Sequence, residues 1–344
     1  MEELEITELV DGIIACDRKA VARAITLVES KKASDVSLSE KLLEGIQSAD
    51  GSSLRIGISG SPGVGKSTFI ESIGQLMLDD GNKLAVLAID PSSSISGGSI
   101  LGDKTRMESL SRNEKVFIRP SPSGESLGGV NRSTRESIAI IEAAGFNITI
   151  VETVGVGQSQ TEVFDMIDIF IVLLSPGAGD QLQGIKRGII EVADILVVNK
   201  SDGDLKSSSR NTVLDYKNAL KLLKPRTKDW SVPVIACSSL ENIGLDECWE
   251  SIQNFQKFIS ASGLLQHNRN KQQKKWLLEE TKQELLDALE KNEDIQDKLR
   301  NTQANIAEDN RPIKTKAKDI VAVSYTHLRA HETSLHLVCR LLLE

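Results

Sequence analysis

The chain has 344 residues, of which 40% are hydrophobic, enough for one large α/β domain with helical additions. Its net charge of -8 argues against a nucleic-acid-binding protein, since lysine and arginine are spread among acids rather than gathered in a basic patch. Four cysteines without a CxxC pair, an acidic N-terminus (MEELEITELV) and no apolar run near ~20 residues predict a soluble cytoplasmic protein without disulfides, targeting peptide or membrane segment.

Residues 1–50 carry leucine, isoleucine, valine and alanine at helical spacing, which predicts an N-terminal helical segment. From Leu54 onward, seven short apolar runs alternate with helical stretches: RIGIS, LAVLAID, VFIRP, ITIVE, IFIVLL, ILVVNK and VPVIACS. Runs that are continuously apolar are typical of parallel strands covered by helices on both faces. We therefore predict a doubly wound, mostly parallel α/β domain over residues 51–260.

Residues 261–322 are polar and helical, as in KKWLLEETKQELLDALEKNEDIQDKLRN. Their apolar stripe is too narrow for a buried core and favours packing on a partner subunit. Residues 323–344 differ in character, since three of the four histidines lie there. His327 and His331 have the i, i+4 spacing of a metal pair. However, the stretch resembles translated sequencing-adapter read-through, so we expect a non-native tail and exclude it from functional reasoning.

GSPGVGKST matches G-x-x-x-x-G-K-[ST] and stands between the predicted strand RIGIS and the helix TFIESIGQLML. Glycines let such a loop surround phosphates, which bind its backbone N–H groups and the helix N-terminus. Lys66 is predicted to contact the β- and γ-phosphates, and the Ser67 hydroxyl to coordinate Mg²⁺. The predicted phosphate-binding residues are Gly60, Ser61, Pro62, Gly63, Val64, Gly65, Lys66, Ser67 and Thr68.

Two further stretches predict recognition of guanine. NKSD follows the strand ILVV and matches N-K-x-D, in which the Asp202 carboxylate accepts from N1–H and the exocyclic amino group of guanine. Adenine offers neither donor, so such a site discriminates strongly. CSSL ends the next strand and is predicted to supply backbone contacts to guanine O6. The nucleotide is thus predicted to be GTP, with GDP as product, bound by Asn199, Lys200, Asp202, Ser238, Ser239 and Leu240.

The metal-binding acids are less conventional. A P-loop GTPase is expected to have Asp-x-x-Gly after a hydrophobic strand, whereas ITIVETVGVGQSQTEVFD has Glu152 and Gly155, followed by Val156 where many small GTPases have a water-orienting glutamine. Asp90 ends the strand LAVLAID, at the carboxyl end where ligands gather. Asp103 lies in GGSILGDKTRM. We predict Ser67, Asp90, Asp103 and Glu152 as Mg²⁺ ligands; the alternative for both aspartates is a helix cap or a turn.

With these pieces in order, the sequence resembles the MeaB/ArgK family of P-loop GTPases, relatives of the human methylmalonic aciduria type A protein. The resemblance extends to about Ala322 and rests on GSPGVGKST, IDPSSSISGGSILGDKTRM, IRPSPSGESLGGV, VETVGVGQSQTEV, GDQLQGIKRGIIEVADILVVNKSDGD and CSSLENIGLDECW. It implies a SIMIBI-like G domain flanked by an N-terminal helical segment and a C-terminal helical dimerisation arm, and hence a homodimer.

The resemblance also implies roles for single residues. Glu152 replaces the usual aspartate and is expected to act on Mg²⁺-bound water or near the γ-phosphate, to which Gly155 donates its N–H. Val156 cannot orient water, so intrinsic hydrolysis should be slow.

A further loop of the family matches SPGAGDQLQGIK and responds to the nucleotide and the partner. Its polar positions Asp180, Gln183 and Lys186 are catalytic candidates, with Lys186 expected to stabilise charge in the transition state. Three glycines, Gly177, Gly179 and Gly184, would let the loop bend. The alternative is that Lys186 merely begins a solvated helix.

Family members act as GTP-dependent chaperones of adenosylcobalamin-dependent acyl-CoA mutases, notably methylmalonyl-CoA mutase, whose cofactor loading they gate and which they protect from inactivation. The sequence has no D-x-H-x-x-G motif, so we do not expect it to bind cobalamin itself. Two alternatives are a metal-insertion GTPase, which usually has a histidine- or cysteine-rich cluster, and a transport-associated P-loop kinase, against which Asp202 argues because it favours GTP over ATP.

Overall fold

The computed structural model describes residues 3–30, 32–49, 51–90, 107–122, 129–153, 163–177, 187–306 and 309–322. The chain divides into two compact units, Met1–Asn270 and Lys271–Glu344. The candidates Asp103, Gly155, Asp180, Gln183 and Lys186, and the predicted non-native tail, lie outside the described residues. The boundaries predicted for the helical segment, the α/β domain and the arm stay predictions.

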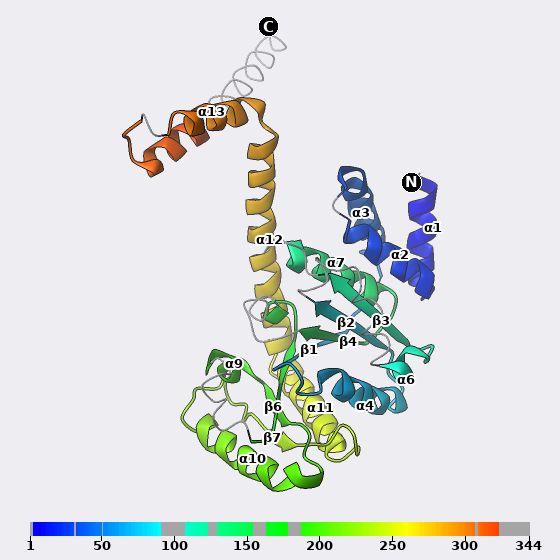
Figure 1. The fold of residues 1–344 in the computed structure, drawn as a ribbon. Coiled ribbons are helices and arrows are strands. Elements are labelled where there is room, and N and C mark those ends of the chain that lie inside the picture. The colour runs from blue at the N-terminus through cyan, green and yellow to red at the C-terminus, as the bar shows by residue number, and fades with distance from the viewer. Residues whose placement is uncertain are drawn as a thin grey trace. The chain divides into compact units, whose positions relative to one another are not determined.

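The first unit contains a seven-stranded sheet of order β3-β2-β4-β1-β5-β6-β7 (Figure 1). All neighbouring strands pair in parallel, and each of the seven predicted apolar runs forms one strand, so the predicted fold is confirmed. The strands are β1 (Leu54–Gly60), β2 (Leu84–Asp90), β3 (Val116–Pro122), β4 (Ile148–Thr153), β5 (Ile169–Leu174), β6 (Ile195–Val198) and β7 (Val234–Ala236). Because β1 lies between β4 and β5, the loop that follows β1 stands at the centre of the carboxyl edge of the sheet.

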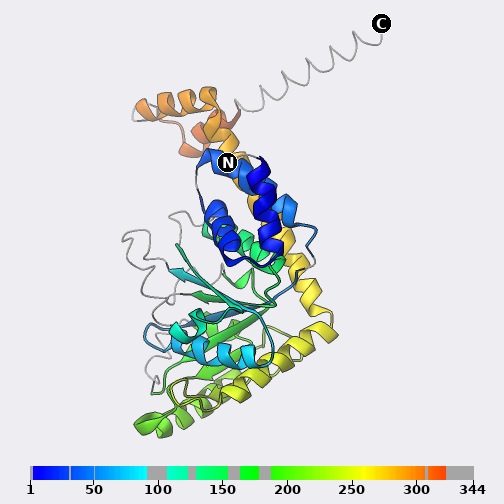
Figure 2. The same cartoon turned by 90° about the vertical axis from the view of Figure 1, so that its right-hand side faces the viewer.

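Both faces of the sheet are buried, which is why its strands are apolar throughout. Alternate residues such as Ile56 and Ile58 of β1 form one core with the helices α4 and α11. The helix α7 lies over the opposite face, and the N-terminal helices pack against it (Figure 2). The described helices from β1 to Ala261 are α4 (Lys66–Asp79), α6 (Glu108–Ser111), α7 (Gly129–Ala143), α9 (Arg187–Val192), α10 (Lys206–Leu220) and α11 (Leu245–Ala261), with the 3-10 turn η2 (Gly203–Leu205) before α10.

The N-terminal segment is helical, as predicted. It forms α1 (Glu3–Ile14), α2 (Arg18–Val28) and α3 (Ala33–Ile46), which pack on one another and on α7. Asp17 caps α2 by accepting a hydrogen bond from the backbone N–H of Lys19 at 3.0 Å. The apolar side of α2 is fully buried, so the segment is part of the same folded unit as the sheet.

The described part of the second unit is mostly helical. The helix α12 (Leu264–Lys291) continues into it and is followed by α13 (Glu293–Ala304), which Asn292 caps through the N–H of Ile295. Leu278 and Leu285, one heptad apart on α12, have exposed side chains. Within the described ranges, no helix combines the length and apolar character needed to cross a membrane.

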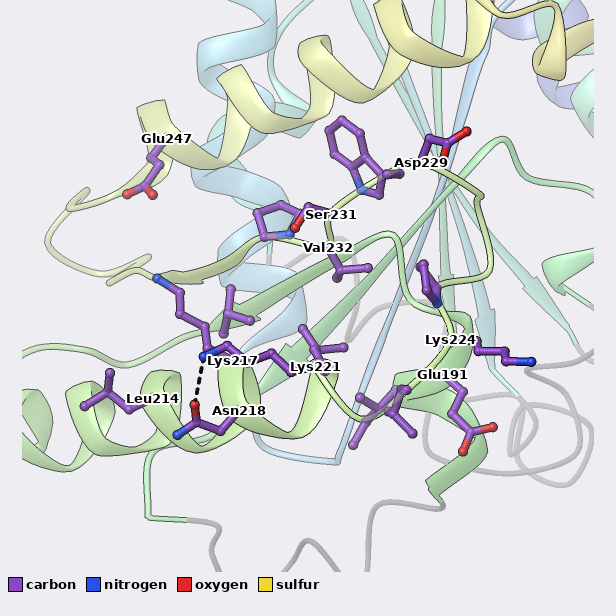
Figure 3. Close-up of a pocket in the computed structure, with 17 residues that line it drawn as sticks. Glu191, Leu214, Lys217, Asn218, Lys221, Lys224, Asp229, Ser231, Val232 and Glu247 are labelled. Atoms are coloured by element: carbon purple, nitrogen blue, oxygen red, sulfur yellow. Dashed lines mark hydrogen bonds between the residues drawn. The ribbon is translucent and has the colours of Figure 1, made fainter.

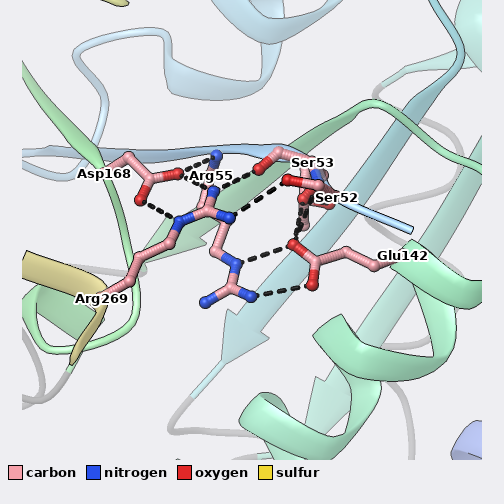
Figure 4. A network of polar contacts seen from close by, with 7 residues as sticks. Ser52, Ser53, Arg55, Glu142, Asp168 and Arg269 are labelled. Atoms are coloured by element: carbon pink, nitrogen blue, oxygen red, sulfur yellow. Dashed lines mark hydrogen bonds and ion pairs between the residues drawn. The ribbon is translucent and has the colours of Figure 1, made fainter. Parts of the chain in front are cut away.

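A polar network lies where β1 begins, at the opposite end of that strand from the loop that follows it (Figure 4). Its four charged members are Arg55, Glu142, Asp168 and Arg269. Nε and Nη2 of Arg55 each donate to Glu142 at 2.8 Å, and Nε and Nη2 of Arg269 donate to Asp168 at 3.0 and 2.6 Å. Arg269 also donates to the carbonyl of Ser53 at 2.6 Å. We call these four residues the amino-edge network; it attaches the first turns of α12 to β1.

Candidate nucleotide-binding site

The glycine-rich loop runs from the end of β1 to the first residue of α4. Gly63 and Gly65 have φ angles of +78° and +91°, in the left-handed region that favours glycine. At Gly65 a side chain would also collide, because a Cβ there would lie 2.8 Å from Nδ2 of Asn199. Both glycines are therefore favoured by backbone conformation, and Gly65 is also required by a close contact.

Lys66 is the first residue of α4, and its side chain is 9% exposed. Its ammonium group donates to the carbonyl of Gly60 at 3.0 Å and to that of Ser61 at 3.4 Å. Burial lowers the pKa of Lys66, and the charge of Glu152 offsets part of that effect. The loop thus holds a buried cation that forms no ion pair with an acid in the described part of the chain, at the place where the sequence predicts phosphates.

The two predicted metal ligands with described side chains lie together. The Ser67 hydroxyl donates to Oε1 of Glu152 at 3.4 Å, and Glu152 is buried near the end of β4. A hydroxyl and a carboxylate beside a phosphate loop are hard oxygen ligands of the kind that Mg²⁺ prefers. Asp90 ends β2, which pairs with β4 so that Ile89 lies opposite Thr153; its backbone is therefore at the same edge.

The N-K-x-D segment hydrogen-bonds to the phosphate loop. Asn199 is 2% exposed, and its Nδ2 donates to the carbonyl of Val64 at 3.0 Å. Its Oδ1 accepts from the N–H and the hydroxyl of Ser239 at 3.1 and 2.8 Å. Lys200 donates to the carbonyl of Gly63 at 2.7 Å. These two residues therefore join the phosphate-binding and guanine-recognition loops.

Asp202 has the position expected of a guanine-recognition residue. Its carboxylate accepts a hydrogen bond from the Ser238 hydroxyl and remains partly exposed. The backbone N–H of Ser201 donates to the carbonyl of Cys237 at 2.9 Å, which holds the two loops side by side. Leu240, in contrast, is 80% exposed. An ionised carboxylate has lone pairs left for the two donors of guanine.

The structure brings together the predicted residues whose positions are described. They come from separate sequence stretches, of which the phosphate loop and Asn199 are 135 residues apart at the Val64 contact, and they share the carboxyl edge of the sheet. The set comprises Gly60 to Thr68, Glu152, Asn199, Lys200, Asp202, Ser238, Ser239 and Leu240, with Asp90 placed by its backbone. Gly177, at the start of the predicted switch loop, has φ +74° and its N–H bonds to Thr212 at 3.2 Å.

Sequence reasoning missed two contributors. The Ser72 hydroxyl on α4 donates to the carbonyl of Ser239 at 2.7 Å. The Cys237 thiol lies 3.5 Å from Oδ1 of Asn199, to which it donates. Ser72 stands outside every predicted stretch, and Cys237 begins the predicted CSSL stretch but was not expected to contribute its side chain, so the fold alone reveals both contacts.

A separate cavity of 810 Å³ lies between α10 and the segment 223–234 (Figure 3). Lys217, Lys221 and Lys224 line it together with the acids Glu191 and Asp229 and with apolar side chains. None of the described residues that line it belongs to the predicted nucleotide-binding set. Over the described ranges, no three histidine, cysteine, aspartate or glutamate side chains gather as a metal site requires.

A glycine-rich phosphate loop, an N-K-x-D segment bonded to it and a parallel sheet that presents both at its carboxyl edge define a P-loop GTPase. The family described as "Methylmalonyl Co-A mutase-associated GTPase MeaB" matches residues 21–294. The chain belongs to this family and is a GTPase that binds GTP and GDP.

Individual relatives agree with this assignment. A putative GTPase of Caulobacter vibrioides is 50% identical over 83% of this chain and 87% of its own length. The mouse protein named methylmalonic aciduria type A homolog, mitochondrial, is 46% identical over 80% of this chain and 69% of its own length. A solved structure titled LAO/AO transport system kinase has a TM-score of 0.73 and 38% identity, and covers 94% of this chain and 99% of that one.

Proposed function

We propose that this GTPase is a chaperone of an adenosylcobalamin-dependent acyl-CoA mutase such as methylmalonyl-CoA mutase, whose cofactor loading it gates and which it protects from inactivation. The carrying observation is the family match over residues 21–294, a family named for its association with that mutase. The mouse relative's name points to the same metabolic setting. The assembled nucleotide site gives the chaperone an energy-dependent step.

In this proposal each nucleotide-binding residue at the carboxyl edge of the sheet has a distinct role. Lys66 neutralises the phosphates, Ser67 and Glu152 hold Mg²⁺, and Asp202 selects guanine. Bound Mg²⁺ would offset the negative charge that develops on the phosphates. Because Val156 offers no group to orient water, hydrolysis by the free protein is slow, and Lys186 supplies the missing positive charge when the mutase is bound.

We further propose that the protein is a cytoplasmic homodimer that forms through the arm of residues 261–322. Exposed leucines on α12, such as Leu278 and Leu285, support an apolar contact between two copies. The described cysteines Cys16, Cys237 and Cys248 are free thiols, which suits a reducing compartment.

The test is GTP hydrolysis by the full chain, alone and with an adenosylcobalamin-dependent acyl-CoA mutase from the same source. We expect slow turnover that rises on adding the mutase and falls to background in Lys66→Ala. Lys186→Ala should keep the slow rate and lose the stimulation.

Fast turnover that is indifferent to the mutase would leave a GTPase whose partner is something else. Replacing GTP by ATP in the same assay addresses the kinase alternative. Turnover of ATP at a rate equal to that of GTP would favour the kinase and contradict the assigned role of Asp202.

A further inference from the structure

Every polar group of Ser239 has a partner in the structure. Its N–H and its hydroxyl both donate to Oδ1 of Asn199, at 3.1 and 2.8 Å, and its carbonyl accepts from Ser72 of α4. The orientation of the Asn199 amide is unambiguous, because Nδ2 faces the carbonyls of Val64 and Gly65 at 3.0 and 3.5 Å while donors face Oδ1. Ser239 and Asn199 are both buried.

This pairing already occupies the Ser239 N–H, which is one of the backbone N–H groups that the CSSL loop offers to guanine. Guanine O6 is an acceptor, and the loop of Ser239 is the one predicted to supply an N–H to it. In the structure that N–H is bonded to Asn199. When the N–H turns to O6, the donors that remain to Oδ1 of Asn199 among the described residues are the Ser239 hydroxyl and the Cys237 thiol, which is a weak donor.

We propose that the Ser239 hydroxyl is a positioning group that keeps the Asn199 amide satisfied while the Ser239 N–H binds the 6-oxo group of guanine. An alanine at this position would leave the buried Oδ1 with the thiol as its one side-chain donor as soon as guanine binds, and an unsatisfied buried acceptor is costly. The same amide holds Val64 and Gly65 of the phosphate loop. Base recognition and phosphate-loop conformation are thereby coupled through a single side chain.

The experiment measures dissociation constants of GDP and of 2-aminopurine ribonucleoside diphosphate, which lacks the 6-oxo group, for the full chain and its variants by titration calorimetry. The analogue also lacks the N1 proton, but that loss is common to all variants and cancels in the ratio. We expect Ser239→Ala to raise the dissociation constant of GDP about 10-fold and that of the analogue by less than about 3-fold. Ser239→Thr keeps the hydroxyl and should restore GDP affinity.

Ser72→Ala is the matched control, because it removes a hydrogen bond to the carbonyl of Ser239 without touching Oδ1 of Asn199. It should weaken both nucleotides by the same factor. Equal weakening of both nucleotides in Ser239→Ala, or unchanged GDP affinity, would overturn the proposal.

If Ser239→Ala does not fold, Ser239→Cys provides the same comparison with a weaker donor. The readout is nucleotide affinity without any partner, so the outcome is independent of whether the mutase is the client.

Discussion

The two edges of the sheet each hold a cation withdrawn from solvent, buried Lys66 at one and partly buried Arg269 at the other, and the two differ in what surrounds them. At the carboxyl edge, Lys66 donates to two backbone carbonyls, and its pKa is lowered because burial outweighs the charge of Glu152. At the amino edge, burial acts on Arg269 in the same direction, but the hydrogen bonds and charge of Asp168 outweigh it and the pKa of Arg269 is raised.

The difference separates a ligand site from a structural one. Among the described residues, the charge of Glu152 does not outweigh the burial of Lys66, so phosphates that bind there would stabilise its charged form. Arg269 has a bidentate carboxylate partner that is itself 1% exposed, so nothing further needs to bind. The amino-edge network therefore holds the fold, and the carboxyl edge is open to exchange its hydrogen bonds with a nucleotide.

The largest expected effect is on chemistry at the carboxyl edge. Lys66→Ala removes the one cation that the described loop offers to the β- and γ-phosphates, and we expect the hydrolysis rate at saturating GTP to fall by about 10²–10³-fold. Single-turnover hydrolysis with GTP measures this directly. Lys200→Ala is the control, since Lys200 bonds to the outer loop carbonyl of Gly63. A smaller loss of hydrolysis rate in Lys66→Ala than in Lys200→Ala would contradict the assignment of Lys66 as the phosphate-binding cation.

At the amino edge the effect should fall on stability. Arg269→Ala leaves Asp168 buried with the backbone N–H of Arg55 as its remaining donor, and we expect the free energy of unfolding to drop by about 2–3 kcal/mol. Arg300→Ala breaks a pair with Asp297 in which both side chains are mostly exposed, so it should cost about 0.5 kcal/mol or less. Urea denaturation measures both. Equal losses of unfolding free energy in the two variants would mean that the amino-edge network stabilises the fold no more than an exposed ion pair does.

The pH dependence of stability should reveal the same network. Burial raises the pKa of Glu142, but the hydrogen bonds and charge of Arg55 and the bonds from Ser53 outweigh it, so the folded-state pKa is lowered from 4.5. The unfolded chain then binds the proton first, so this contribution is present above pH 4.5 and is lost as pH falls through the folded pKa.

Glu142→Gln should cost about 1–2 kcal/mol at pH 7 and reduce the loss of stability on acidification. The exposed Glu108, paired with Arg112, provides the control variant Glu108→Gln. Urea denaturation between pH 7 and pH 3.5 follows both variants. An unchanged acid slope in Glu142→Gln would show that its carboxylate is not paired in solution.

The sequence predicted the residues at the carboxyl edge of the sheet far better than those of the amino-edge network. Phosphate and guanine recognition require fixed residue types at fixed spacings, so Lys66 and Asp202 were predictable from local patterns. The amino-edge network joins four segments that no spacing relates, because Arg55, Glu142, Asp168 and Arg269 meet only through strand order and helix packing. Ser72 was missed for the same reason, since its partner Ser239 is 167 residues away.

The smallest expected effect is a change in stability that should have opposite signs when the charge of Lys66 and that of Arg269 are removed. Lys66→Met keeps the aliphatic stem and removes a charge that burial disfavours, so without nucleotide we expect the unfolding free energy to rise by about 0.5 kcal/mol. Arg269→Met should lower it, because its removal leaves a buried carboxylate unpaired. With GDP and Mg²⁺ the wild-type protein should become more stable than Lys66→Met, since only the wild-type protein gains the binding energy of the phosphates. Thermal melting of the wild-type protein and the two variants, with and without GDP and Mg²⁺, measures these three changes in stability. A nucleotide-free loss above about 1 kcal/mol in Lys66→Met would mean that its bonds to Gly60 and Ser61 stabilise the fold more than its burial costs.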